Sequence, residues 1–524
     1  LIYNEQLATV SSLLKSTLSV GSMTFLSRLL GLARDMVIAR FFPVGEADTF
    51  IIAFKIPNFL RRLFAEGAFS LAFVPVLSEY RSQFTPAETR DLIDRVAGTL
   101  GGILLVLSLI GVVASPAVIS IVAAGFIDQP DKFQLTSDML RITFPYILFI
   151  SMTGMAAGIL NTWNHFAVPA FTPVLLNVSM ISCAVWLSPM LDAPIIALAW
   201  GVFIAGILQL SFQLPFLYRE GLLPRPKWGW RHAGVQKIIK LMIPALFGSS
   251  VAQINLLFDT FIASFLVSGS VAWLYYSDRL LEFPLGVFGI ALATVVLPNL
   301  SQAHYKEGST HFNKTLQWAI QLSLVIALPA TIGLFLLAQP ILSTLFQYGA
   351  FQSSDSLMSA YSLMAYCLGL PAFILIKILA NGFYARQDTK TPVRIGIQSM
   401  VLNMVLNVVF VVTMLQNDFI APHVGLALAT TTSAYFNALM LAMKLRQGNI
   451  IESFSDYGLP LFRTLMACCA MAALIVLLMP GIDAWTNWQW FERTFHLAQI
   501  IVPAGLCYAL MLWIMGFRRN HFVL

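Results

Sequence analysis

Long apolar runs separated by short polar segments dominate this chain of 524 residues. About 20 consecutive apolar residues are enough for a helix to cross a lipid bilayer. Unbroken runs such as 100–113 and 322–337 differ from the alternating segments of about ten residues that a membrane β-barrel requires. The pattern predicts an all-α polytopic membrane protein. Its fourteen predicted transmembrane helices span 14–39, 47–78, 92–123, 135–160, 168–188, 195–218, 236–267, 270–300, 315–346, 356–384, 393–415, 422–444, 460–480 and 496–517.

Basic residues fall in alternate loops between these spans. Loops rich in Lys and Arg face the cytoplasm, and the intervening loops contain little beyond Lys132 and Arg493. This asymmetry requires an even number of spans and predicts that both termini are cytoplasmic. The basic loops contain Arg81, Arg90 and Arg95; Arg219, Arg225, Lys227, Arg231 and Lys237; Lys306 and Lys314; Arg386, Lys390 and Arg394; Lys444 and Arg446; and Arg518 and Arg519.

A repeat with an offset of 223 or 224 residues links the two halves of the chain. The offset covers six predicted spans, so the halves share one orientation and are related by an axis along the membrane normal. We predict an N-terminal lobe (1–232), a C-terminal lobe (233–455) and an accessory helix pair (456–524). The matched pairs are Pro75 with Pro298, Pro169 with Pro392, and Gly125 with Gly349.

The composition agrees with this class of protein. Hydrophobic residues make up 58% and charged residues 11%, whereas a soluble protein carries about 25% charged residues. This excludes a soluble enzyme, a disordered chain and a disulfide scaffold. The five cysteines lie in apolar runs without His at ligand spacing, so we predict no metal site. Nucleotide-binding and catalytic motifs are absent from the sequence, which favours a transporter without a cofactor over an enzyme. The basic residues of the loops explain the net charge of +6, so no nucleic-acid partner is predicted.

Charged residues inside the predicted spans are the most informative feature of the sequence. Each costs roughly 2.5–3.5 kcal/mol at the bilayer centre on insertion scales. They concentrate in the first, second and eighth spans, which predicts a water-filled polar cavity lined by these helices. The residues are Arg28, Arg34, Asp35, Asp48, Lys55, Arg61, Arg62, Glu66, Asp278, Arg279 and Glu282.

Helical spacing groups some of these side chains on common faces. Asp278 and Glu282 share a stripe with Tyr275, and Arg28 aligns with Asp35 seven residues later. Arg34 lies about 120° away from that line on an ideal helix. A bend at Gly31 would bring all three onto one cavity, so Gly31 is the candidate hinge. In the second span, one face carries Lys55, Asn58, Arg62 and Glu66.

Two interpretations of the charged cluster remain open at this point. The charges could form interhelical salt bridges without further function. Alternatively, the local excess of basic residues, most of them Arg, indicates an anionic cargo, because the guanidinium fork binds phosphate in a bidentate manner. With no motif for ATP use, the energy would come from the membrane potential or an ion gradient.

Four segments resemble the MurJ (MviN) family of lipid II flippases, which belongs to the MOP exporter superfamily. They are SMTFLSRLLGLARD (22–35), ADTFIIAFKIPNFLRRLFAEGAFSLAFVPVLSEY (47–80), YYSDRLLEFPLGVFGIALATVVLP (275–298) and FYARQDTKTPV (383–393). The resemblance implies two six-helix lobes plus two helices in the bacterial cytoplasmic (inner) membrane. The implied cargo is lipid II, undecaprenyl-pyrophosphate carrying the peptidoglycan disaccharide-pentapeptide, and cell-wall synthases are further candidate partners.

The resemblance also assigns roles to residues. The family's essential cavity arginines match Arg28, Arg34, Arg61 and Arg279, and its hydrophobic groove for the polyprenyl tail matches helices 460–517. A sodium site of some family members resembles Asp259, Asn403, Asn407 and Thr430, with Asn407 where those members have an acid; this is a candidate site for Na⁺ or H⁺. The acidic and polar cavity partners match Asp35, Asp48, Asn58, Glu66, Asp278 and Glu282.

Three other functions remain as alternatives. A multidrug antiporter of the MATE type would need an acidic cavity for cationic drugs, which the excess of Arg argues against. A flippase for another undecaprenyl-linked glycan would carry the same diphosphate and so would have the same cavity charge. A scaffold that recruits cell-wall synthases would need no cavity arginines at all.

Overall fold

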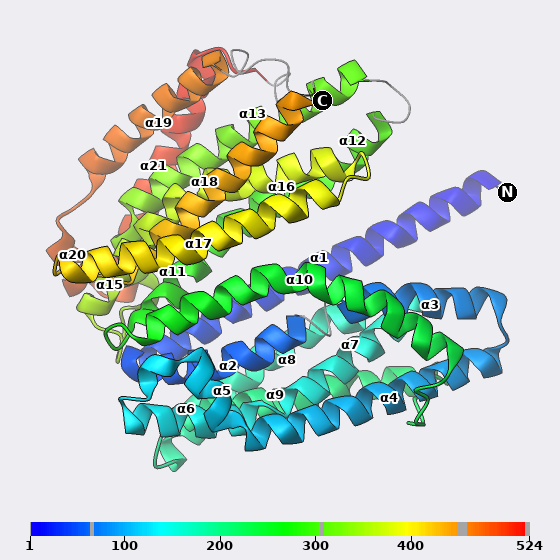
Figure 1. Cartoon of the computed structure of the whole chain (residues 1–524). Helices are drawn as coiled ribbons and strands as arrows, with labels where there is room; N and C mark the ends of the chain where they lie inside the picture. The colour runs from blue at the N-terminus through cyan, green and yellow to red at the C-terminus, as the bar shows by residue number, and fades with distance from the viewer. Residues whose placement is uncertain (1, 63–67, 304–308, 449, 451–457, 519–524) are drawn as a thin grey trace. The chain divides into compact units, whose positions relative to one another are not determined.

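The computed structural model describes residues 2–62, 68–303, 309–448, 450 and 458–518, and this part of the chain is helical with no β-strand. The chain folds into two compact units, Leu1–Ser268 and Gly269–Leu524. Figure 1 shows the helices in chain order from blue to red. The predicted all-α class is confirmed.

The first unit contains ten α-helices among its described residues. α1 packs against α8, α7 and α8 both pack against α9, and α10 packs against α3. Apolar residues of α3, α4 and α7, among them Phe73, Leu92 and Ile159, form its buried core with α10. The helices are α1 (Ile2–Phe41), α2 (Val44–Arg61), α3 (Phe69–Gln83), α4 (Pro86–Val113), α5 (Ser115–Val122), α6 (Pro130–Thr143), α7 (Tyr146–Thr162), α8 (Ala167–Ser182), α9 (Ile196–Arg219) and α10 (Ala233–Ser264), with short 3₁₀ or π turns at Ala124–Phe126, Cys183–Leu187 and Ser188–Met190.

The second unit carries the remaining helices. α17 packs against α18, α16 against α13 and α18, and α11 against α15. The helices are α11 (Ser270–Pro284), α12 (Ala291–Gln302), α13 (Ser309–Leu336), α14 (Ala338–Phe346), α15 (Ser353–Leu368), α16 (Leu370–Tyr384), α17 (Lys390–Gln416), α18 (Val424–Gln447), α19 (Gly458–Leu478), α20 (Ile482–Asn487) and α21 (Trp490–Ile514), with a π turn at Leu285–Ile290.

Local sequence fixes the start of several helices. At α4, the hydroxyl of Thr85 accepts from the amide of Glu88 while the Glu88 carboxylate accepts from the amide of Thr85, a capping box that satisfies otherwise unpaired donors. Pro86 follows at the first helical position, where its missing N–H costs nothing. Gln352 and Asp355 form the same arrangement at α15.

Helix starts repeat between the two units at the offset found in the sequence. α14, α15 and α17 begin 223 residues after α5, α6 and α8, respectively. Pro169 and Pro392 are each the third residue of their helix, where a proline is tolerated. The glycine pair behaves differently, because Gly349 has a φ of 65°, whereas Gly125 packs against the backbone of Ser264.

Eleven helical segments of the described chain are long and apolar enough to cross a membrane. They coincide with eleven of the fourteen predicted spans. The other three predicted spans correspond to α1, to α2 with α3, and to α10. The exact number of spans stays a prediction. The lobe boundary at 232/233 also stays a prediction. In the structure, α10 packs with the helices that precede it and belongs to the first unit.

Candidate functional site

Arg34 and Asp35 form a buried charged group on α1. Arg34 is 6% exposed and Asp35 is 2% exposed. The guanidinium donates to Asp35 Oδ1 from Nε at 3.0 Å and from Nη2 at 2.7 Å. Its Nη1 donates to the side-chain oxygen of Asn177 on α8 at 3.2 Å, and the Asn177 amide donates to the Ser27 carbonyl at 3.1 Å. One arginine is therefore held by a carboxylate of its own helix and by an amide of a neighbouring helix.

The role of Asn177 as a partner of Arg34 was not predicted from the sequence. Asn177 lies in an apolar segment of α8, and a polar side chain at membrane depth usually bonds to a neighbouring helix. That signal could have marked Asn177 as an interhelical contact, although hydropathy alone does not identify its partner.

Gly31 and Arg28 occupy the same helix with different surroundings. α1 continues through Gly31 without interruption. A Cβ added at Gly31 would meet only Asn177 Nδ2, at 3.9 Å, which is an ordinary contact distance. Arg28, predicted to face the same cavity, is exposed, whereas Arg34 and Asp35 are buried.

Two charged residues of α2 contact two other helices of the first unit, α6 and α10. Asp48, 2% exposed, lies 4.0 Å from the ammonium of Lys132 on α6. Lys55 donates to the Thr260 hydroxyl of α10 at 2.8 Å. These contacts connect α2 to its neighbours within the first unit.

Arg61 and Asn58 interact within α2. Arg61 donates to the Asn58 side-chain oxygen from Nε at 3.0 Å and from Nη2 at 2.8 Å. The predicted face placed Asn58 with Arg62 instead; Arg62 is half-buried. Glu66, the last member of that face, lies outside the described residues.

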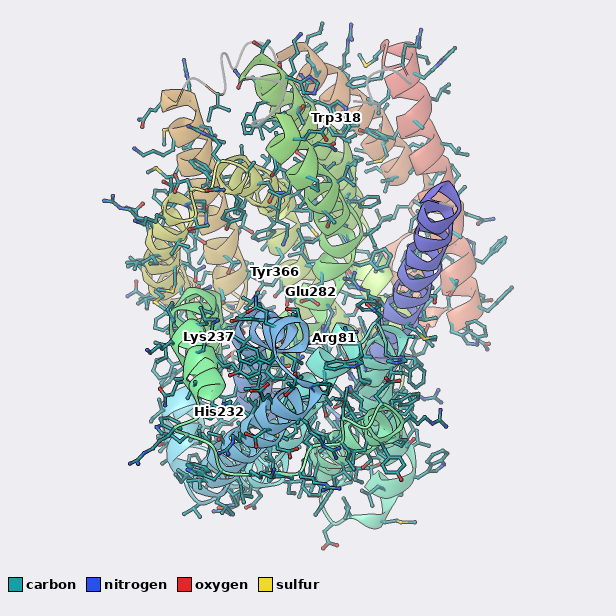
Figure 2. All side chains as sticks on the ribbon, turned by 90° about the vertical axis from the view of Figure 1, so that its right-hand side faces the viewer. Arg81, His232, Lys237, Glu282, Trp318 and Tyr366 are labelled. Atoms are coloured by element: carbon teal, nitrogen blue, oxygen red, sulfur yellow. The ribbon has the colours of Figure 1, made fainter. Side chains whose placement is uncertain are left out.

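α11 of the second unit carries Arg279. Its guanidinium donates to Glu282 Oε2 at 2.9 Å and lies over the Tyr275 ring, 4.9 Å from its centroid. The Arg279 and Glu282 side chains are 35% and 46% exposed, and Asp278 is also exposed. Glu282 is labelled in Figure 2.

The opposite face of α11 is fixed to α15. Trp273 Nε1 donates to Asp355 Oδ1 at 3.0 Å, and the Ser277 hydroxyl donates to the Ser359 carbonyl at 2.7 Å. These buried contacts position the charged face of α11. The predicted cavity combines α1 and α2 of the first unit with α11 of the second, and it remains a prediction.

Three of the four residues proposed for a cation site are grouped between α17 and α18. The Asn407 amide donates to Asn403 Oδ1 at 3.0 Å, and the Asn403 amide lies 3.3 Å from the Thr430 hydroxyl and 3.4 Å from the Ser433 hydroxyl. Asn403 and Asn407 are buried. Ser433 was not predicted. Asp259 belongs to α10 in the first unit, so its place in this site also stays a prediction.

α19 and α21 pair with each other at the end of the chain and pack on α13 and α14. Met471, Ile475, Ile500 and Trp485 form a buried cluster between them and their neighbours. The outer faces are also apolar and include Phe462, Leu477, Val502, Leu506 and Leu510, all more than half exposed. A polyprenyl chain is chemically compatible with such a surface.

The fold and these charged helices define a polytopic α-helical membrane transport protein. A family model described as "Lipid II flippase MurJ" matches residues 37–496. The chain belongs to the MurJ family, and it is therefore a multi-pass protein of the inner membrane.

Curated relatives match over nearly the whole chain. The "Probable lipid II flippase MurJ" of Haemophilus influenzae is 47% identical over 513 residues, covering 95% of this chain and 99% of that protein. The protein of the same name from Vibrio cholerae is 49% identical over 519 residues, covering 97% and 98%.

One solved structure belongs to the same family, and a second shares the fold. A structure titled "Lipid II flippase MurJ, inward closed conformation" matches with a TM-score of 0.77 and 29% identity, covering 94% of this chain and 98% of that one. An inward-facing MATE multidrug transporter of the MOP superfamily matches with a TM-score of 0.66 at 14% identity, covering 82% and 98%. The second match is informative about the fold alone.

Proposed function

We propose that this protein is a lipid II flippase, a transporter that moves undecaprenyl-pyrophosphate-linked peptidoglycan precursor from the cytoplasmic to the periplasmic leaflet. The observation that carries this proposal is the end-to-end similarity to curated MurJ proteins at 47% and 49% identity. The MATE-type antiporter is not favoured, because the similarity to a MATE transporter is 14% in sequence and therefore shows a common fold alone. The chain is a transporter and catalyses no covalent step.

The diphosphate of the cargo is the group that the cavity arginines would bind. Arg28, Arg34, Arg61 and Arg279 supply guanidinium groups, which match phosphate oxygens in a bidentate manner. In the structure, carboxylates or an amide already hold Arg34, Arg61 and Arg279. An arriving diphosphate would compete with these groups, so Asp35, Asn58 and Glu282 set how readily each arginine is released. Lys55 and Arg62 add positive charge, and Asp48, Glu66 and Asp278 are the remaining acidic partners.

Alternating access would then carry the head group across the membrane. The lobes rock about the bound diphosphate, while the polyprenyl tail stays in lipid along α19 and α21. Both termini remain in the cytoplasm. The return step is driven by the membrane potential or by a monovalent cation at Asn403, Asn407, Thr430 and Asp259. A cell-wall synthase that uses lipid II at the periplasmic face is the expected functional partner.

Gly31 is the proposed hinge of α1 in this cycle. Because a Cβ at Gly31 meets no atom closer than 3.9 Å, Gly31→Ala leaves the packing intact and changes only backbone flexibility. We expect normal protein levels and stability but slower lipid II translocation in Gly31→Ala. A translocation rate equal to that of the parent protein would remove the hinge proposal.

Leaflet-resolved labelling of lipid II in cells depleted of their own flippase tests the function. The parent chain should restore periplasmic lipid II, whereas Arg34→Ala and Arg279→Ala should not. Arg225→Ala, an exposed arginine outside the charged helices, is the matched control and should rescue fully. Full rescue by both cavity variants would exclude a phosphate clamp. Failure of the parent chain on lipid II with success on another undecaprenyl-linked glycan would exclude lipid II as the cargo.

A further inference from the structure

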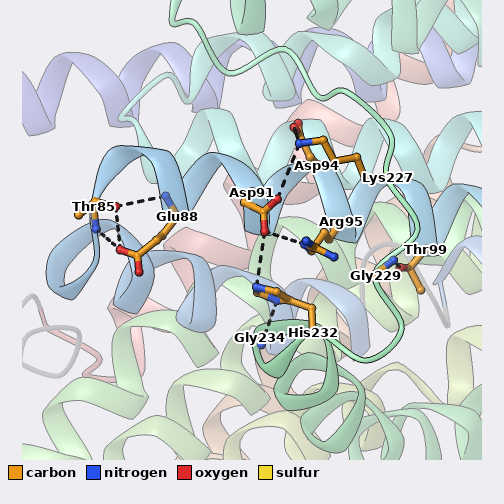
Figure 3. Close-up of polar contacts among 10 residues, drawn as sticks. All are labelled: Thr85, Glu88, Asp91, Asp94, Arg95, Thr99, Lys227, Gly229, His232 and Gly234. Carbon is orange, nitrogen blue, oxygen red and sulfur yellow. Dashed lines mark hydrogen bonds and ion pairs between the residues drawn. The ribbon is translucent and has the colours of Figure 1, made fainter.

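The connection between α9 and α10, residues 220–232, lies along α4. The Lys227 amide donates to the Asp94 carbonyl at 3.0 Å. The Gly229 amide donates to the Thr99 hydroxyl at 3.0 Å, and both residues are labelled in Figure 3. A Cβ at Gly98 would stand 2.2 Å from the Lys227 carbonyl oxygen, so the two backbones are in direct contact at that point. The connection is therefore held in one register against the helix.

Between the connection and α4 lies an open pocket of about 820 Å³ in the first unit. Trp228 and Trp230 are 64% and 45% exposed, although large aromatic side chains are usually well buried. Two arginines lie beside these two indole rings. The lining residues are Arg95, Trp228, Gly229, Trp230, Arg231 and His232.

The pocket retains positive charge after its ion pairs are counted. Arg95 donates from Nε to Asp91 at 2.6 Å. Lys227 lies 3.2 Å from Asp94 and 3.7 Å from Asp91, and His232 Nε2 lies 3.9 Å from Asp91. Asp91 and Asp94 thus supply two negative charges, whereas Arg95, Lys227 and Arg231 supply three positive charges. Within the described part of the chain, Arg231 makes no ion pair, and the described bond of Arg95 leaves its two terminal amino groups available.

The position of the pocket along α4 corresponds to the membrane surface. The uncharged stretch 96–113 begins directly after Arg95. Trp228 packs over its first turns, because a Cβ at Gly102 would lie 3.0 Å from Trp228 Cζ3. Tryptophan is enriched at this depth, where its ring meets acyl chains and its N–H meets water. His232 and Lys237, at the start of α10, are labelled in Figure 2.

We propose that this pocket binds the phosphodiester head group of an anionic glycerophospholipid. Arg95 and Arg231 contact the phosphate oxygens, and the Trp228 and Trp230 rings cover the glycerol and the upper acyl chains. Basic pockets at the ends of membrane helices are suited to such head groups. The site lies within the first unit and is independent of the charged helices α1, α2 and α11.

Quenching of tryptophan fluorescence by brominated lipids tests this assignment on the full-length protein in vesicles. Brominated phosphatidylglycerol and brominated phosphatidylcholine are compared at equal mole fraction in phosphatidylcholine. Subtracting the signal of Trp228→Phe isolates the contribution of Trp228. We expect this contribution to be quenched more strongly by phosphatidylglycerol, with a preference of about fivefold for each arginine engaged.

Arg231→Gln should reduce the preference, and Arg95→Gln with Arg231→Gln should abolish it. Arg231 is exposed, so the single variant should fold normally. Arg225→Gln removes another exposed charge from the same connection outside the pocket and should leave the preference unchanged. Equal quenching by the two lipids, or an unchanged preference in Arg231→Gln, would overturn the proposal. If soluble glycerol phosphate competed fully, the ligand of the pocket would be a free anion and the lipid assignment would be wrong. Lipid II translocation by Arg231→Gln is measured separately, so either proposal can fail alone.

Discussion

Arg34 on α1 and Arg279 on α11 are predicted to bind the same diphosphate, yet their surroundings differ. The Arg34 side chain is 7% exposed and is held by Asp35 and by Asn177 of another helix. The Arg279 side chain is 35% exposed and pairs with Glu282 three residues later on its own helix. Removing one partner of a buried pair leaves an uncompensated charge, whereas an exposed pair contributes little to stability. Arg34 thus combines a structural role with its proposed role in transport, and Arg279 has mainly the latter.

Arg34→Ala should have the largest effect on stability. Truncation leaves the Asp35 carboxylate buried without its guanidinium, which costs about 3–5 kcal/mol. The melting temperature of the purified protein should fall strongly, together with lipid II translocation. Arg28→Ala, an exposed arginine of the same helix, is the stability control. Equal melting temperatures for the two variants would contradict a structural role for Arg34.

Asn177→Ala should have an intermediate effect. It removes the acceptor for Arg34 Nη1 and the donor to the Ser27 carbonyl. An unsatisfied buried polar group costs about 1–3 kcal/mol. Asn299 is an exposed asparagine that also donates to a backbone carbonyl, so Asn299→Ala should cost less in the same melting experiment. If Asn177→Ala melts like the parent protein, Asn177 does not support Arg34.

Arg279→Ala should separate transport from stability. The loss of an exposed ion pair costs up to about 1 kcal/mol, while the proposed diphosphate contact is lost completely. Arg141 provides a matched control, because it forms a similarly exposed pair with Asp138 at the same spacing of three residues. Both variants should melt close to the parent temperature, and only Arg279→Ala should lose lipid II translocation. A large fall in the melting temperature of Arg279→Ala would end the contrast with Arg34.

The sequence was sufficient to predict where the helices lie and which of them carry charge. The length of an apolar run locates a membrane helix. Because a charge in lipid is costly, a charged residue inside such a run stands out in the sequence. The repeat offset also recurs in the helix starts at α14, α15 and α17.

Side-chain partners were not predictable from the sequence. Adjacent residues do not share a face of an ideal helix, yet Arg34 reaches Asp35 because its side chain is long and flexible. Arg61, not Arg62, reaches Asn58, because residues three and four positions apart are both neighbours on a helix surface and spacing alone does not choose between them. Asn177 and Thr260 were missed because a contact between helices depends on how each helix is rotated, which spacing along one chain does not contain.

Asp388 extends the comparison to a carboxylate between two spans, and its expected effect is the smallest. Bonds from the Thr391 hydroxyl and from the amides of Thr391 and Lys390, at the start of α17, lower the pKa of Asp388 below its ordinary value of 3.8. A lowered pKa in the folded state adds stability above pH 3.8, and this contribution is lost as the pH falls through the folded-state pKa. Asn accepts the same bonds but does not titrate. The stability difference between the parent protein and Asp388→Asn should therefore shrink as the pH falls from 6 to 3, measured by thermal melting at each pH. A difference that stays constant over this range would show that the charge of Asp388 does not stabilise α17.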